Sequence, residues 1–181
     1  MIGGASGVGK TSIARALARF YNIDLVRVDD FQLLLEATTT PEALPALHYW
    51  STFPNWRDES VDDLVSRLID VGKVLTPGLA AVARDHITEN IPMVLEGDFI
   101  LPEFAASFEN PRIKSVFIHE PSREQILQNY FAREGEVQPC RANISHLYSS
   151  WLEKECLKSN IPVILSRPWS TLMERIANHI K

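Results

Sequence analysis

The eight residues from position 4 to position 11 constrain the fold more than any other segment of this chain. They match the pattern GxxxxGK followed by Ser or Thr, as Gly4-Ala5-Ser6-Gly7-Val8-Gly9-Lys10-Thr11. Glycines let such a backbone curl so that successive N–H groups point inward, and the helix that follows adds the positive end of its dipole. The segment therefore predicts a phosphate-binding loop between a buried strand and a helix.

Each polar side chain of this loop has an expected partner on a nucleotide triphosphate. Lys10 carries a mobile positive charge for the β- and γ-phosphates, and the Thr11 hydroxyl is a ligand for Mg²⁺. Ser12 is placed to reach the α-phosphate. We therefore expect Mg-ATP to bind along Gly4, Ala5, Ser6, Gly7, Val8, Gly9, Lys10, Thr11 and Ser12.

Short apolar runs alternate with helical patterns along the rest of the chain, which indicates an α/β fold with a parallel sheet. The expected helices carry apolar residues at helical spacing, and one of them is expected to begin at Thr76 and Pro77, residues typical of a cap and a first turn. The expected strands are rich in Val, Ile and Leu, as buried parallel strands are: Leu25–Val28, Pro92–Glu96, Lys114–His119 and Pro162–Ser166.

Length and composition favour one soluble domain that spans residues 1–181, with no internal repeat or linker. Only Met1 and Ile2 precede Gly3, although a central strand of about five residues normally precedes such a loop. We therefore expect a natural start upstream of Met1. No basic-then-apolar leader and no long apolar run occurs, so we expect a cytoplasmic protein without a membrane span.

Charge and cysteine content exclude several classes of protein. The net charge of −5 argues against tight, non-specific binding to nucleic acid, although a local basic pocket can still exist. The two cysteines are too few for a disulfide framework, and no Cys/His spacing typical of zinc sites occurs.

Three carboxylates follow predicted strands, at the edge of the sheet where ligands of open α/β folds bind. Asp29 and Asp30 follow the second strand, and a carboxylate there can accept the proton of an attacking hydroxyl; the alternative is a helix cap, and it is strongest for Asp30. Glu96 ends the strand Met93-Val94-Leu95-Glu96 and is a candidate for holding Mg²⁺, whereas Gly97 and Asp98 are typical of a turn.

A short polar stretch, residues 134–139, separates two predicted helices and is flanked by Arg133 and Arg141. Arginines in a mobile lid can clamp phosphates during transfer. We expect a lid at about residues 133–142, with Arg133 acting in catalysis and Arg141 on the nucleotide. Two exposed arginines without a ligand are the alternative, and Arg123 is a weaker candidate.

Two further segments have interpretations that the residues leave open. The region from Leu44 to Trp56 is dense in aromatic residues and is either a substrate wall or a small core under a long loop. The segment Ser166-Arg167-Pro168-Trp169 lies either beside the nucleotide base or in a simple turn.

With these residues in view, the chain resembles 2-phosphoglycerate kinase of the P-loop kinase superfamily. The resemblance rests on residues 2–11, on Asp29, on Leu44-Pro45-Ala46-Leu47-His48 and on Leu95-Glu96-Gly97 with Pro102 beyond. It implies a three-layer fold with a five-stranded parallel sheet in the order 2-3-1-4-5, flanked by helices, with a short lid. It also implies ATP-dependent phosphorylation of a small molecule.

A second resemblance is to the uridine kinase and nicotinamide riboside kinase group. It rests on Val28-Asp29-Asp30-Phe31, Asn55-Trp56-Arg57-Asp58 and Leu95-Glu96-Gly97, and it implies that Asp29 acts as a base toward a sugar hydroxyl. Gln32 stands where the phosphoglycerate family usually carries an arginine, which leaves the acceptor open. A nucleotide-dependent switch is the alternative of another class, although no Asn-Lys-x-Asp guanine motif occurs.

Overall fold

A computed structural model describes residues 1–180. Five strands form one sheet in the order β2-β3-β1-β4-β5, and every pairing between neighbouring strands is parallel. This confirms the predicted α/β fold and its strand order. The strands are β1 (Ile2–Gly3), β2 (Asp24–Arg27), β3 (Met93–Gly97), β4 (Val116–His119) and β5 (Val163–Leu165). Val28, expected to end the second strand, instead begins a helix.

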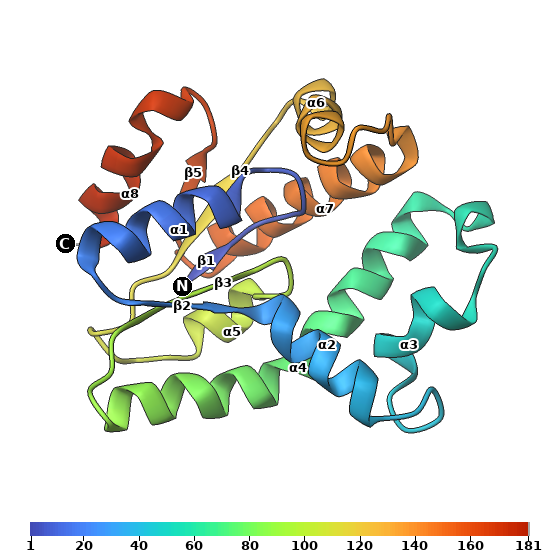
Figure 1. Ribbon diagram of the computed structural model, residues 1–181. Coiled ribbons are helices and arrows are strands. Elements are labelled where there is room, and N and C mark those ends of the chain that lie inside the picture. Colours follow the sequence, from blue (N-terminus) through green and yellow to red (C-terminus); the bar gives the residue numbers. More distant parts are fainter. Residues whose placement is uncertain (181) are drawn as a thin grey trace.

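Helices connect the strands and cover both faces of the sheet (Figure 1). Helices α1 and α8 contact strands from one side, and α7 contacts β4 and β5 from the other. The helical segments are α1 (Lys10–Tyr21), α2 (Val28–Thr38), α3 (Pro45–Thr52), η1 (Trp56–Asp58), α4 (Val61–Thr88), α5 (Pro102–Ala106), α6 (Arg123–Glu134), α7 (Pro139–Lys158), η2 (Trp169–Thr171) and α8 (Leu172–Ile180).

Helix α4 corrects one expectation, because it runs without a break through Pro77, where a new helix was expected to begin. A proline inside a helix removes one hydrogen bond and costs roughly 3 kcal/mol. The packing on both sides outweighs that cost, since Leu75 and Leu79 are almost fully buried. In addition, the Thr76 hydroxyl donates to the Gly72 carbonyl at 2.8 Å. Because Pro77 has no N–H, the Lys73 carbonyl lacks its usual hydrogen bond within the helix. Lys73 is an exposed residue.

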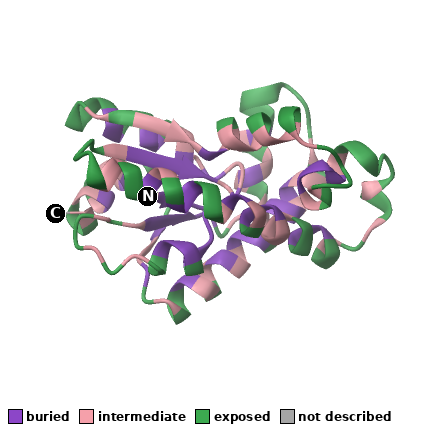
Figure 2. Ribbon diagram, turned by 90° about the horizontal axis from the view of Figure 1, so that it is seen from below, coloured by how far each residue is buried: buried purple, intermediate pink, exposed green. Residues whose placement is uncertain are grey.

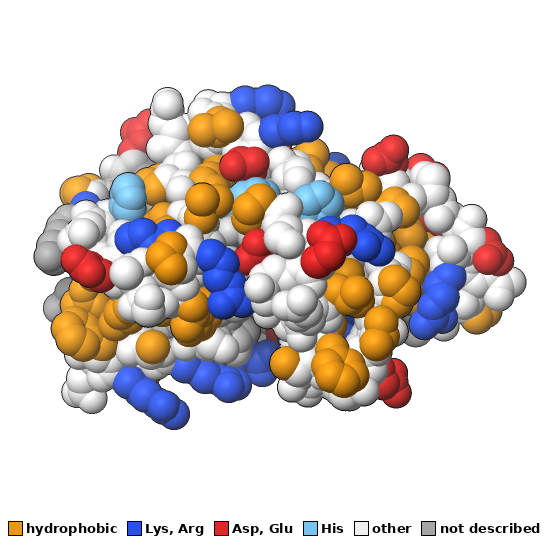
Figure 3. All heavy atoms as spheres, turned by 90° about the horizontal axis from the view of Figure 1, so that it is seen from above, with side chains coloured by type: hydrophobic (Ala, Val, Ile, Leu, Met, Phe, Trp, Pro, Cys, Tyr) orange, Lys and Arg blue, Asp and Glu red, His pale blue; other side chains and the backbone are white. Residues whose placement is uncertain are grey.

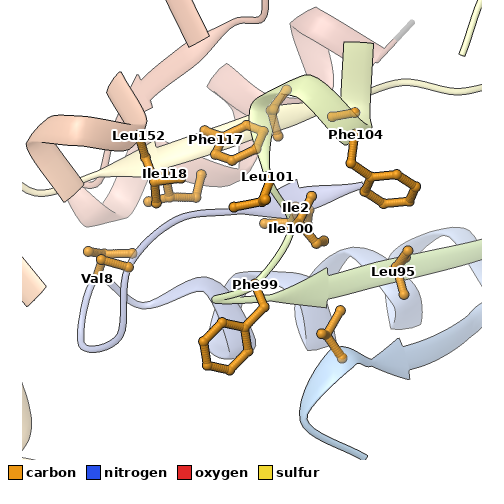
Figure 4. Close-up of a cluster of buried hydrophobic side chains, with 14 of the residues drawn as sticks. Ile2, Val8, Leu95, Phe99, Ile100, Leu101, Phe104, Phe117, Ile118 and Leu152 are labelled. Carbon is orange, nitrogen blue, oxygen red and sulfur yellow. The ribbon is translucent and has the colours of Figure 1, made fainter. Parts of the chain in front are cut away.

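Buried residues gather around the middle of the sheet, as the burial colours of Figure 2 show, and most of them are apolar. Figure 4 shows part of this core, with Ile2 of β1, Leu95 of β3 and Phe117 of β4 among the labelled residues. Val8 of the phosphate-binding loop belongs to the same cluster and is 1% exposed. The loop is therefore fixed to the core by an apolar contact as well as by its neighbouring strand.

Two groups of helices extend beyond the carboxyl ends of the strands (Figure 1). One group consists of α2, α3 and the first part of α4, and the other consists of α6 and the first part of α7. Among the described helices, none combines the length and the apolar character that a bilayer crossing requires.

The end of β3 and the start of α2 pack so closely that only glycine fits at position 97. A Cβ atom there would lie 2.4 Å from the Cβ of Val28, which is fully buried. We expect Gly97→Ala to lower the free energy of unfolding by about 1–3 kcal/mol, because the added methyl group forces a shift in a packed core. Chemical denaturation measures this change.

Gly78→Ala is the matched control. Gly78 lies exposed in α4, and a Cβ atom built on it meets nothing within 4 Å. Alanine favours a helix over glycine by roughly 1 kcal/mol, so this variant should be as stable as the wild type or more stable. Equal effects of the two substitutions would contradict the proposed close contact.

Candidate functional site

The phosphate-binding loop connects β1 to α1 and has the backbone geometry of an anion cradle. Gly7 and Gly9 have φ angles of 80° and 98°, a region that side-chain-bearing residues rarely adopt. Gly9 is the N-cap of α1, and no side chain caps that end of the helix. The N–H groups of the first turn therefore have no side-chain cap, the arrangement that an anion site at a helix start requires.

Lys10 lies at the start of α1 and is only 4% exposed. Its ammonium group donates to the Ala5 carbonyl at 2.9 Å and also to the Asp98 carboxylate. The ion pair holds the ammonium over the loop. Sequence analysis had assigned Asp98 only to a turn; the signal that could have found it was its place directly after β3, two residues beyond Glu96.

Thr11 and Glu96 meet at the carboxyl end of β3. The Thr11 hydroxyl donates to Glu96 Oε2 at 3.3 Å, and Glu96 is 2% exposed. Burial raises the pKa of Glu96, while Lys10 and the Thr11 hydroxyl oppose that rise. The two predicted Mg²⁺ ligands are thus brought together, whereas no described cluster holds three or more His, Cys, Asp or Glu in metal-binding proximity. This donor set fits Mg²⁺, which usually takes one or two protein oxygens beside phosphate and water.

Asp29 and Asp30 lie in the first turn of α2, and neither caps the helix with its side chain. Asp29 is half-buried and lines the cleft described below, whereas Asp30 is exposed and does not. The geometry therefore separates two residues that the sequence treated nearly alike. Arg27 donates to Asp29 Oδ2 at 2.7 Å.

Arg133 and Arg141 lie on either side of the connection between α6 and α7, and both pair with one carboxylate. Arg133 Nε donates to Glu134 at 2.9 Å, and Arg141 Nη1 donates to it at 2.9 Å. Both guanidinium groups also lie over the ring of Tyr130. Hydrogen bonds from Gln138 and from Arg133 lower the pKa of Glu134 to about 2. Arg123 pairs with Glu124 and is not among the cleft residues.

Most of these groups line one cleft of about 1560 Å³ at the carboxyl edge of the sheet: Lys10, Thr11, Asp29, Asp98, Arg133 and Arg141. Glu96 and Glu134 are not among its lining residues. Seven basic and three acidic side chains line it among the described residues, although the whole chain is acidic. On the face that Figure 3 shows, which is the molecule of Figure 1 seen from above, basic and acidic side chains are interspersed. The cleft is therefore a local basic pocket within an acidic chain, which is compatible with the predicted phosphate site. Ser6 and Ser12 belong to its lining.

Residues from the end of β5 close the cleft beside the phosphate-binding loop. A Cβ atom on Gly9 would lie 2.6 Å from the ring of Trp169, so that ring lies directly against the loop. Arg167 borders the cleft and lies 3.7 Å from the buried carboxylate of Glu120. Asn129 of α6 donates to the Gly7 carbonyl at 2.7 Å. The structure thus places the segment 166–169 at the loop.

The aromatic segment divides into a buried part and a part that faces the cleft. Leu47, His48 and Tyr49 are buried, and His48 lies 3.1 Å from the Thr39 hydroxyl. Trp50 and Trp56 pack edge to face at 5.3 Å, and both line the cleft. The small-core interpretation therefore holds for Leu47, His48 and Tyr49, whereas a substrate wall at Trp50 and Trp56 stays a prediction.

Arg57 also lines this end of the cleft, and its guanidinium lies 4.4 Å from the centroid of the Trp56 ring. In the sequence it was named only as part of Asn55-Trp56-Arg57-Asp58, without a role of its own. An arginine beside a tryptophan in a segment rich in aromatic residues was the available signal.

Comparisons with known proteins bear on the fold and on its relatives. No family model matches the chain. It is 27% identical over 126 residues to the mevalonate-3-phosphate 5-kinase of Thermoplasma acidophilum, a match that covers 66% of this chain and 61% of that protein. The chain therefore spans less than two thirds of the length of this relative.

Two solved structures resemble the chain over almost its whole length. A gluconokinase from Sinorhizobium meliloti has a TM-score of 0.57 at 16% identity, and the match covers 99% of this chain and 89% of that one. A protein from Thermus thermophilus has a TM-score of 0.60 at 16% identity, with coverages of 98% and 92%. The chain has the same fold as these proteins, and together the likenesses support the P-loop kinase superfamily without reaching a particular member.

Proposed function

We propose that this protein is a kinase that transfers the γ-phosphate of ATP to a hydroxyl group of a small metabolite. One observation carries the proposal: the phosphate-binding loop with Lys10, the Thr11–Glu96 pair and the carboxylate of Asp29 all lie at the same edge of the sheet. A phosphate donor, a metal position and a base for the acceptor are therefore adjacent. The sequence relative and one fold relative are themselves small-molecule kinases by name, which supports the proposal.

The nucleotide would lie with its phosphates in the loop from Gly4 to Gly9 and against Lys10, Thr11 and Ser12. Thr11 and Glu96 would hold Mg²⁺, which when bound screens the charge that develops on the phosphates. Arg167 and Trp169 border the loop and are the side chains available to contact the base of the nucleotide. Lys10 would follow the charge that moves toward the leaving oxygen.

Asp29 would accept the proton of the acceptor hydroxyl as that oxygen attacks the γ-phosphorus. Arg133 and Arg141 would close over the transferring phosphate from the lid, residues 133–142, exchanging their bonds with Glu134 for bonds with phosphate oxygens. Both arginines line the same cleft as Asp29, which supports this assignment.

The acceptor would occupy the end of the cleft formed by α2, α3 and η1. Gln32, Trp50, Trp56 and Arg57 line it. Among the described residues, no salt bridge engages Arg57. A guanidinium that stacks on an aromatic ring keeps its N–H groups free for an anion. This favours an anionic acceptor of the 2-phosphoglycerate kinase type, and the name of the sequence relative also describes a phosphorylated acceptor.

The flat surfaces of Trp50 and Trp56 favour the second candidate, a nucleoside kinase of the uridine or nicotinamide riboside kinase type. An aromatic wall of this kind can stack on a base. A nucleotide-binding switch is the alternative of another class, and it requires no acceptor at all. Release of ADP from Mg-ATP across a panel of glycerate phosphates, sugar acids, nucleosides and sugars separates the three, with Lys10→Ala as the inactive control.

Asp29→Asn should lower kcat by about 100- to 10,000-fold with the acceptor that stimulates turnover, because the amide cannot take up the proton. Affinity for Mg-ATP, measured by fluorescence titration, should stay close to that of the wild type. Asp30→Asn is the matched control and should keep most of the activity, since Asp30 does not line the cleft. Loss of nucleotide affinity with preserved turnover in Asp29→Asn would refute its assigned role.

Arg57→Gln and Trp56→Leu discriminate between the two acceptor classes. If the acceptor is anionic, Arg57→Gln should raise its KM by roughly 10- to 100-fold, the effect of losing one charge-assisted hydrogen bond. Trp56→Leu should then have the smaller effect. The reverse order, with Trp56→Leu dominant for a nucleoside acceptor, would favour the alternative. Steady-state kinetics with saturating Mg-ATP measure both values.

A further inference from the structure

Arg27 lies between three carboxylates at the candidate active site. Its guanidinium contacts Asp29 Oδ2 at 2.7 Å through Nη2, Asp30 Oδ1 at 3.5 Å through Nη1, and Glu96 Oε1 at 3.5 Å through Nε. One side chain thus links the proposed base of the transfer to the proposed holder of the metal. No role has yet been assigned to it.

The backbone fixes this arrangement from two directions. Arg27 is the last residue of β2, and its parallel partner in β3 is Glu96, so the two side chains extend from the same face of neighbouring strands. Arg27 is also the N-cap of α2, which places Asp29 in the first turn, two residues away. Because Val28 packs against Gly97, the start of α2 cannot move away from the end of β3 without loss of that contact.

The bond to Asp29 leaves one carboxylate oxygen for chemistry. Arg27 engages Oδ2, and no hydrogen bond between described residues reaches Oδ1. An aspartate that is held through one oxygen has a fixed side-chain orientation, and the second oxygen remains available to an acceptor hydroxyl. Asp29 is 43% exposed in its side chain, so without this bond it would be free to rotate into solvent.

The ion pair between Arg27 and Glu96 compensates a buried charge. Glu96 is almost completely buried, and a buried carboxylate without a partner destabilises a protein strongly. The Nε atom of Arg27 is itself buried and makes no hydrogen bond within the described chain, and it lies 3.5 Å from Glu96 Oε1 as an ion pair. The guanidinium is therefore held on one side by a rigid strand and extends its other side to Asp29.

We propose that Arg27 is a positioning residue for phosphoryl transfer, which anchors Asp29 to the rigid end of β3 so that Oδ1 meets the acceptor hydroxyl. This inference rests on the proposed kinase function. In the step that it supports, the acceptor oxygen forms a bond to the γ-phosphorus, the hydroxyl proton moves to Asp29 Oδ1, and the bond from the γ-phosphorus to the bridging oxygen of ATP breaks to leave ADP. Arg27 contacts Asp29, not the reacting atoms.

Two other roles for Arg27 make different kinetic predictions. As a counter-ion for Glu96 alone, it would affect the folded protein's stability but not the kcat of the molecules that fold. As a direct ligand of an anionic acceptor, it would set the KM for that acceptor while kcat stayed near the wild-type value. A positioning role instead lowers kcat at unchanged acceptor KM, because substrate binds normally but the base is misplaced.

The test compares Arg27→Gln and Arg27→Lys with the wild type, using the acceptor that stimulates ADP release most. Arg27→Gln should lower kcat by about 100-fold, with the acceptor KM and the Mg-ATP affinity each within about twofold of wild type. Arg27→Lys should recover part of kcat, because it keeps the charge but cannot contact two carboxylates as a fork. Arg84→Gln is the matched control, since Arg84 lies exposed on α4 outside the cleft.

The outcomes separate this inference from the function on which it rests. A wild-type protein that no acceptor stimulates overturns the proposed function and this inference with it. Acceptor-stimulated transfer in the wild type, with kcat unchanged or only KM raised in Arg27→Gln, overturns the positioning role alone. If Arg27→Gln fails to fold in a thermal unfolding scan, the same criteria apply to Arg27→Lys. A wild-type kcat in Arg27→Lys then refutes a role that needs the guanidinium to contact two carboxylates at once.

Discussion

A single buried carboxylate, that of Glu96, sets the arrangement of the candidate site. The strand order places β3 between β1 and β2, so the end of β3 lies between the phosphate-binding loop and the first turn of α2. A carboxylate that is 2% exposed requires polar partners, and it finds Thr11 on one side and Arg27 on the other. The groups proposed to hold the nucleotide and the acceptor are thereby tied to one rigid strand end. Displacing either partner removes part of the compensation of this buried charge, so a change at the site also affects the stability of the fold.

Close approach of backbone segments supports this arrangement on both sides. At Gly97 the start of α2 comes within a distance that admits no side chain, and at Gly9 the ring of Trp169 lies against the loop in the same way. Gly9 also has a left-handed φ angle, so two separate requirements select glycine there. The cleft between these contacts is therefore shaped by the backbone, while the side chains that extend into it from α3, η1 and the connection between α6 and α7 supply its charge and its aromatic surface.

The sequence predicted the sheet well because its signals are local. The loop motif, the short apolar strands and the acids at strand ends depend on neighbours along the chain, and they indicated a parallel α/β sheet with Thr11, Asp29 and Glu96 at one edge. The strand order came only from the resemblance to P-loop kinases. Packing between segments that are distant along the chain could not be predicted from the sequence. The continuity of α4 through Pro77 depends on burial on both sides of the proline, and the ion pair of Lys10 with Asp98 joins residues far apart in sequence. The distinction between Asp29 and Asp30 likewise required the direction of a helix turn, which no residue pattern defines.

The basic groups of the phosphate end are not free charges, and this affects how a nucleotide can bind. Lys10 is paired with Asp98, Arg133 and Arg141 are paired with Glu134, and Arg167 lies near Glu120. Each carboxylate provides a counter-ion for its cation. Each carboxylate also competes with an incoming phosphate for the same N–H groups. The net free energy of binding at each position is thus the difference between the interaction of the cation with phosphate and its interaction with the carboxylate. Phosphate carries more charge and more acceptor oxygens than a carboxylate, so the exchange favours the ligand, and it favours most strongly a ligand that replaces several carboxylates at once. In the proposed site, a triphosphate would satisfy that condition better than inorganic phosphate, because it carries several phosphate groups that can each replace a carboxylate.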